Sequence, residues 1–202
     1  MTSGPSPAEV GERLRERRKE LAISVRELAR RVAVSPSLIS QIENGKTSPS
    51  VGTLYAIVNE MDLSLDEVFS DAGAGRRSFN GGRELPSPVV TEDERKEISL
   101  GSGVRWQRLT RAADPNVDFL HLTYEPGSAS CPEDHLMRHV GHEYGYVISG
   151  RLGVTVGFDT YELGAGDSIS FDSTEPHRLA ALGDEPVYAI WSVVGRKADP
   201  RV

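Results

Sequence analysis

The stretch SVRELARRVAVSPSLISQIENGKTSPSVGTLYAI, residues 24–57, contains the start and stop signals of several short helices. Ser24 and Ser35 stand where a hydroxyl can cap a helix N-terminus, and Pro36 follows at the position where helices tolerate proline. Asn44-Gly45 is typical of a helix C-terminus. We therefore predict one short helix after Ser24 and a second between Pro36 and Asn44, joined by a tight turn.

Signals on both sides extend this stretch to an all-α bundle of about five helices over residues 9–70. A first helix is expected to bury Val10, Leu14 and Leu21, whose spacing fits one apolar helix face. Capping boxes, in which a serine and a glutamate cap each other's backbone, mark two further helix starts. The other helices are expected from Ser24 with Glu27, from Ser50 to about Met61, and from Ser64 with Glu67 to Phe69.

The charge of the chain is unevenly distributed. The whole sequence of 202 residues has a net charge of −7, which argues weakly against a nucleic-acid partner. Residues 1–50, however, hold nine basic and six acidic side chains, a net charge of +3. A basic region attached to an acidic body can carry local affinity for DNA.

Several classes of protein are excluded by what the sequence lacks. It has no run of about 18 apolar residues, so we expect no membrane-spanning helix and no membrane partner. The N-terminus has no apolar signal region, and the single cysteine, Cys131, suits a reducing compartment. We expect a cytoplasmic protein.

The sequence pattern changes after residue 70. Residues 71–100 are expected to form a linker, with a strand near Pro88–Thr91. Over residues 101–198, apolar and polar residues alternate between turns rich in glycine and proline. Seven short strands at this spacing predict an all-β sandwich or barrel, so the fold class is α+β in two domains. The expected strands are 104–111, 117–125, 144–149, 151–157, 159–163, 167–172 and 186–194.

The helix after Pro36 has the two faces that a DNA-reading helix needs. With 3.6 residues per turn, Leu38, Ile39 and Ile42 group on one side. The other side has no large apolar residue and presents Gln41, whose amide can form two hydrogen bonds with adenine. Neighbouring residues are expected to contact base edges or phosphates. The candidate DNA contacts are Ser24, Val25, Arg26, Ser35, Pro36, Ser37, Ser40, Gln41, Asn44 and Lys46.

Residues 14–69 resemble the Xre-type helix-turn-helix domain of phage repressors, and the segment ISQIENGK fits a signature of that family. The resemblance implies sequence-specific binding to double-stranded DNA. Family members bind inverted repeats as dimers, so it also implies a homodimer. By the same resemblance, Pro36, Ser37 and Gln41 contact bases, and Arg18 pairs with Glu43.

All five histidines lie in the region after residue 100, and four of them, His135, His139, His142 and His177, sit near expected strand boundaries. His139 and Glu143 are four residues apart, and His177 follows after 33 more residues. This order suits two ligands from one hairpin region and one from a later strand. Two imidazoles and one carboxylate can form a facial triad, an arrangement that non-haem Fe(II) prefers. Alternatively, the three side chains form hydrogen bonds with an organic effector directly.

The same region resembles the cupin family, whose members form a small double-stranded β-barrel of jelly-roll type. His139, Glu143 and Gly150 fall on the second histidine, the glutamate and the final glycine of the first cupin motif. Met137 replaces the first histidine of that motif, and His177 falls near the end of the second motif. The resemblance leaves open a divalent metal (Fe, Zn, Ni or Mn) or no metal. The spare donors near the triad would be His135 or His142.

Two classes of function follow. The first is a transcriptional regulator that reads an inverted-repeat operator as a homodimer, while its cupin domain binds a small-molecule effector and mediates dimerisation. The second is a mononuclear non-haem iron enzyme, because the cupin resemblance extends to a phosphonate epoxidase. The complete DNA-reading face within residues 24–47 favours the regulator, with no enzymatic activity.

Overall fold

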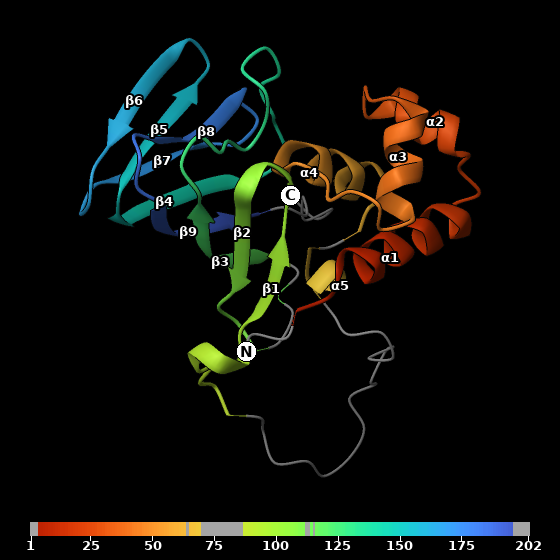
Figure 1. Ribbon diagram of the computed structural model, residues 1–202, viewed down its shortest axis with the longest axis horizontal. Helices are drawn as coiled ribbons and strands as arrows, with labels where there is room; N and C mark the ends of the chain where they lie inside the picture. The colour runs from red at the N-terminus through yellow and green to blue at the C-terminus, as the bar shows by residue number, and fades with distance from the viewer. Residues whose placement is uncertain (1–3, 64, 70–86, 112–113, 115, 196–202) are drawn as a thin grey trace.

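The computed structural model describes residues 4–63, 65–69, 87–111, 114 and 116–195. Five helices gather on one side of the molecule and two antiparallel sheets on the other, so the predicted α+β fold class is confirmed (Figure 1). Within this part of the chain, no helix is long and apolar enough to cross a membrane. The helices are α1 (Pro7–Glu20), α2 (Val25–Arg31), α3 (Pro36–Glu43), α4 (Val51–Glu60) and α5 (Leu65–Phe69), with 3₁₀ turns at Glu92–Glu94 and Gly101–Gly103.

A serine begins each of the first four helices, and its hydroxyl accepts a hydrogen bond from the backbone of the third helical residue. Helix α1 begins earlier than predicted because Ser6 and Glu9 form a full capping box. The capping box expected at Ser24 is only half formed. The predicted bond from the Ser24 backbone N–H to the Glu27 carboxylate is wrong, since that carboxylate accepts from Arg30 and Arg31 instead. Ser64, the start of the other expected capping box, lies outside the described residues.

The helical bundle is held together by an apolar core and one buried ion pair. Val10 and Leu14 of α1 are buried as predicted, but Leu21 is 39% exposed because α1 ends before it. The expected pairing of Arg18 with Glu43 is confirmed: Nη2 of Arg18 donates to Oε2 of Glu43 over 2.8 Å. Burial disfavours both charges, so this pair needs its close geometry to hold α1 against α3.

Nine strands form the second domain in the part of the chain that the structure describes. A six-stranded sheet has the order β1-β2-β3-β9-β4-β7, and a three-stranded sheet has the order β6-β5-β8. The strands are β1 (Lys96–Ser99), β2 (Val104–Arg108), β3 (Val117–Tyr124), β4 (His142–Ser149), β5 (Arg151–Val156), β6 (Asp159–Leu163), β7 (Ser168–Asp172), β8 (His177–Leu182) and β9 (Val187–Val194).

Strands β1 and β8 were not predicted, and the strand predicted near Pro88–Thr91 is wrong. Strand β8 has the sequence HRLAAL, which lacks the alternation that identifies a half-buried strand, because four of its six residues are buried. Strand β1 lies within the segment expected to be a linker and pairs with β2. Residues 88–91 form no strand, and they lead into the 3₁₀ turn that follows. Residues 70–86 of the expected linker lie outside the described residues.

Gly145 of β4 is a strict packing requirement of this barrel. A Cβ atom at this position would lie 2.0 Å from the Trp191 ring. That ring is 3% exposed, so the surrounding core prevents it from shifting. We therefore expect Gly145→Ala to lower the free energy of unfolding by about 1–3 kcal/mol in urea denaturation. Gly164→Ala is the matched control, because its Cβ would make only ordinary contact at 3.7 Å. Equal stability of the two variants would contradict this packing.

Candidate functional site

Helix α3 presents one face to the core and the other to solvent. Ile39 and Ile42 are buried and Leu38 is partly buried, whereas Ser37 and Gln41 are exposed, as predicted. The turn before α3 is tight because Ala33 adopts a positive φ of 55°. Of the ten predicted DNA contacts, nine are exposed and Val25 is half-buried against the core.

Some of these candidates already have structural tasks. Ser24 and Ser35 cap α2 and α3, and the Asn44 amide donates to the Ser40 carbonyl over 2.7 Å. These hydrogen bonds fix the N-terminal ends of α2 and α3 and the C-terminal end of α3. Ser37 and Gln41 lie about one turn apart on α3, and both side chains are exposed to solvent.

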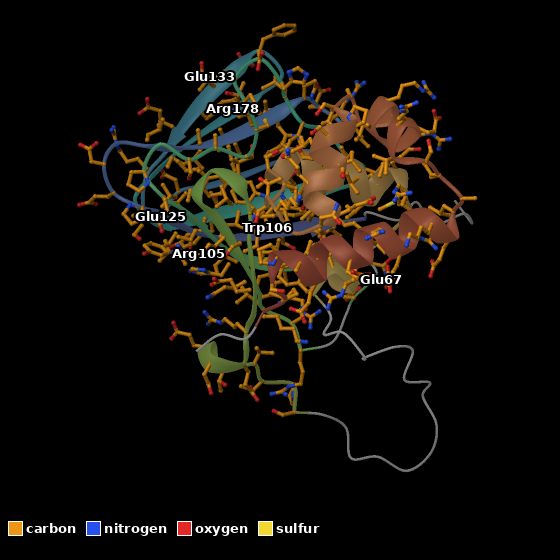
Figure 2. The ribbon with its side chains drawn as sticks, turned by 45° about the vertical axis from the view of Figure 1, so that its right-hand side comes forward. Glu67, Arg105, Trp106, Glu125, Glu133 and Arg178 are labelled. Atoms are coloured by element: carbon orange, nitrogen blue, oxygen red, sulfur yellow. The ribbon has the colours of Figure 1, made fainter. Side chains whose placement is uncertain are left out.

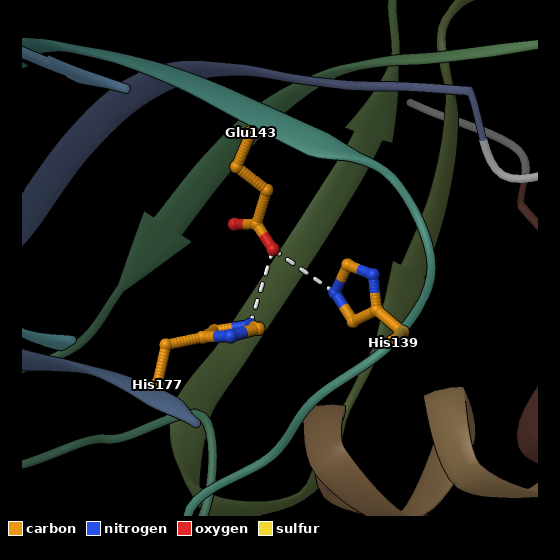
Figure 3. Close-up of side chains that lie close together, drawn as sticks. All are labelled: His139, Glu143 and His177. Atoms are coloured by element: carbon orange, nitrogen blue, oxygen red, sulfur yellow. Dashed lines mark ion pairs between the residues drawn. The ribbon is translucent and has the colours of Figure 1, made fainter. Parts of the chain in front are cut away.

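The structure brings His139, Glu143 and His177 together inside the barrel (Figure 3). Nε2 of His139 lies 2.9 Å from Oε1 of Glu143, and Nε2 of His177 lies 3.1 Å from the same oxygen. The three residues are at most 5% exposed. Glu143 is on β4 and His177 begins β8, while His139 lies just before β4, so both sheets contribute to the cluster.

The outer atoms of the same side chains are fixed by hydrogen bonds. Nδ1 of His139 faces the Val140 carbonyl at 3.3 Å, and Nδ1 of His177 faces the Glu175 carbonyl at 2.8 Å. A carbonyl can only accept, so each Nδ1 carries a proton, and the Nε2 of each ring points inward toward Glu143. Nε1 of Trp191 donates to Oε2 of Glu143 over 2.6 Å.

The three inward atoms, Nε2 of His139, Nε2 of His177 and Oε1 of Glu143, have no hydrogen-bond partner among the described residues. Their mutual distances are short, but the contacts lack hydrogen-bond angles. Buried acceptors that converge in this way require a positive charge between them. A proton or a divalent cation can supply it, and the donor set of two imidazoles and one carboxylate fits Fe(II), Zn, Ni or Mn.

The ionisation of the triad agrees with this requirement. Burial disfavours the charged carboxylate, but the two neighbouring imidazoles outweigh that effect and lower the pKa of Glu143 to about 2. Burial also opposes the charging of His177, yet its contact with Glu143 raises the pKa of this imidazole above its usual value. A carboxylate that stays ionised inside the barrel attracts a cation, and a metal ion at Nε2 of His177 would compete with a proton for the same lone pair.

The spare donors expected near the triad lie elsewhere. His135 is on an exposed loop beside Asp134, and His142 lies against Tyr144 on the outer side of the sheet. Cys131 is buried, but it lines a cleft between the barrel and the helices. Among the described residues, the triad is therefore the only group of three or more His, Cys, Asp or Glu side chains that lie close enough to hold a metal ion.

Two residues of the site were not predicted for it. Trp191 of β9 packs in the core, and its hydrogen bond also orients Glu143. The Tyr55 ring of α4 stacks on His139, with ring centres 4.2 Å apart and planes 13° apart. No local signal links Tyr55 to a histidine 84 residues later in the chain. The Phe171 ring of β7 lies 5.1 Å from the His177 ring between centres.

Comparisons with known proteins agree with both domains. A helix-turn-helix family model matches residues 14–68, and a cupin domain model matches residues 120–193. HTH-type transcriptional regulator PuuR of Escherichia coli is 30% identical over 172 residues, which cover 84% of this chain and 86% of PuuR. The chain belongs to this family of helix-turn-helix transcriptional regulators with a cupin domain.

Two further comparisons extend over most of the chain. HTH-type transcriptional regulator SutR of Escherichia coli is 22% identical over 175 residues, which cover 87% of this chain and 88% of SutR. The crystal structure of an HTH_3 family transcriptional regulator from Vibrio cholerae has a TM-score of 0.65 at 22% identity, covering 95% of this chain and 97% of that one. The likeness to that structure confirms the fold.

The geometry of the triad predicts one divalent ion per regulator chain. Isothermal titration with Fe(II), Zn²⁺, Ni²⁺ and Mn²⁺ measures this directly. His177→Ala removes one of three protein ligands, so we expect a loss of affinity beyond the roughly 10–100-fold that is typical of outer-shell partners. His135→Ala, which changes an exposed histidine, is the control and should bind as the wild type does. Equal affinity in His177→Ala and the wild type would place the ion elsewhere.

Proposed function

We propose that this regulator is a sequence-specific DNA-binding protein that acts as a cytoplasmic homodimer and whose cupin domain senses a divalent metal ion, with or without an organic effector. The observation that carries the proposal is the division of α3 into two faces. Ile39 and Ile42 anchor the helix in the core, and the opposite face exposes only small or polar side chains. That division is what insertion into a major groove requires.

The roles of the individual contacts follow from their chemistry. The Gln41 amide offers both a donor and an acceptor and is suited to the edge of adenine. Ser37 and Ser40 can each bond several base edges, while Arg26 and Lys46 neutralise phosphates and set the position of the domain. Bases are thus read by α3, and the N-terminus of α2 lies against the backbone of the DNA.

A dimer surface is proposed on the outer face of the six-stranded sheet. The strand register places Phe119 of β3 and Tyr144 of β4 on either side of Ser192 on the intervening strand β9. Phe119, Tyr144, Tyr146 and nearby Ile148 are all at least 38% exposed, so this part of the face presents apolar area that a second copy can cover. Two-fold pairing here would double the number of base contacts.

We propose the triad as the sensing site, because its three buried acceptor atoms can bind a cation. Its side chains are too enclosed for a large ligand to reach without movement of the barrel. An organic effector has room in the cleft of about 900 Å³ between the helices and the barrel, which is lined by Val34, Leu38 and Met137 among others.

The enzymatic alternative rests on the same triad, since two histidines and a glutamate can hold Fe(II) with open positions. Such an iron would supply oxygen chemistry to a bound substrate. The exposed polar face of α3 has no task in that chemistry. The names of the curated relatives are those of regulators, so we propose that the chain has no enzymatic activity.

Capture of genomic fragments tests the proposal. The full chain is mixed with sheared DNA of its own organism at about 0.15 M salt, where non-specific contacts are weakened, and the retained fragments are sequenced. We expect enrichment of a few sites that share an inverted repeat. Bulk binding that depends only on salt would contradict the proposal and would favour iron-dependent catalysis.

Gln41→Ala tests the reading helix itself. We expect the variant to lose about 1–3 kcal/mol of specific binding free energy in a gel shift with a captured fragment, because a bidentate base contact is removed. Asn59→Ala removes an exposed amide from α4 and is the matched control, for which we expect unchanged affinity. Unchanged affinity of Gln41→Ala would remove Gln41 from base readout.

A further inference from the structure

Helix α4 belongs to the DNA-binding domain but lies directly against the cupin barrel. The Gly52 N–H donates to the Ser130 carbonyl over 3.0 Å, and just before α4 the Pro49 carbonyl accepts from the Gly101 N–H over 2.8 Å. The Tyr55 ring meets His139 face to face and the edge of Trp106 at 5.5 Å between centres. Figure 2 shows Trp106 on β2 where the sheet meets the helices.

The same helix forms part of the core that supports α3. Leu54, Ile57 and Val58 of α4 are at most 1% exposed. They belong to one continuous apolar cluster that includes Ile39 of α3 and extends into the barrel. A movement of α4 relative to the barrel would therefore carry the DNA-reading helix with it, because close-packed cores do not deform gradually.

Tyr55 also forms a wall of the triad. It is 4% exposed and covers one face of the His139 ring, whose Nδ1 makes only a long bond to the Val140 carbonyl, at 3.3 Å. Figure 3 shows helix α4 passing beside His139. If α4 withdrew, this imidazole would lose the stacking that keeps its Nε2 directed at Glu143.

We propose that Tyr55 links the two sites: it is a positioning residue that holds His139 ready for a cation, and a cation bound to the triad in turn holds α4 and α3 in place. This inference rests on the proposed function and adds the route of regulation to it. An ion that favours the position of α4 against the barrel changes the affinity for DNA. By thermodynamic linkage, DNA then changes the affinity for the ion by the same factor.

The test uses the full chain, Zn²⁺ as the ion and a captured genomic fragment as the DNA. For the wild type, we expect Zn²⁺ to change the DNA dissociation constant by at least about five-fold, and the fragment to change Zn²⁺ affinity equally. Tyr55→Leu keeps apolar bulk but removes the flat ring, so Zn²⁺ affinity should fall and the linkage should shrink to less than two-fold. Tyr55→Phe keeps the ring and should retain both.

Each failure has its own signature. Thermal melting followed by circular dichroism first establishes that both variants are folded, and Zn²⁺ titration without DNA measures the positioning role even if no fragment is captured. Absence of captured fragments would contradict the proposed function alone. Wild-type linkage that persists in folded Tyr55→Leu, Zn²⁺ affinity equal in the wild type and Tyr55→Leu, or no wild-type linkage at all would overturn the role of Tyr55.

Discussion

Three buried acceptor atoms converge inside the barrel, and the surrounding structure is organised around the positive charge that they require. The described part of the chain offers them no hydrogen-bond donor. Two backbone carbonyls fix the histidine tautomers, and Trp191 occupies the remaining oxygen of Glu143. The lone pairs of His139 and His177 consequently point inward, where they can bind a proton or a metal ion.

The packing that maintains this geometry extends well beyond the triad. The Trp191 ring lies against Gly145, so the smallest residue in β4 sets the position of the donor to Glu143. On the other side, Tyr55 connects His139 to the helix that supports the DNA-reading domain. The regulator therefore has one continuous core rather than two independent ones, and that continuity gives a buried ion a mechanical connection to α3.

What could be predicted from the sequence depended on local patterns. Helix α3 was recognised because Ser35, Pro36 and the Asn44-Gly45 pair mark its two ends, and the triad because cupin motifs have characteristic spacing. Strand β8 was missed because burial of four of its six residues removes the alternation. Tyr55 and the orienting role of Trp191 could not be predicted, since both depend on contacts between residues far apart in the chain. His135 was a reasonable spare ligand by proximity, but its loop points it to solvent.

X-ray absorption at the zinc edge of the full chain loaded with one equivalent of Zn²⁺ tests the cation site most directly. The triad predicts a first shell of nitrogen and oxygen only, with imidazole nitrogens at about 2.0–2.1 Å and the outer-ring scattering of two histidines. A sulfur shell at about 2.3 Å would mean that Cys131 binds the ion instead. A spectrum without imidazole scattering would contradict a metal held by His139, Glu143 and His177.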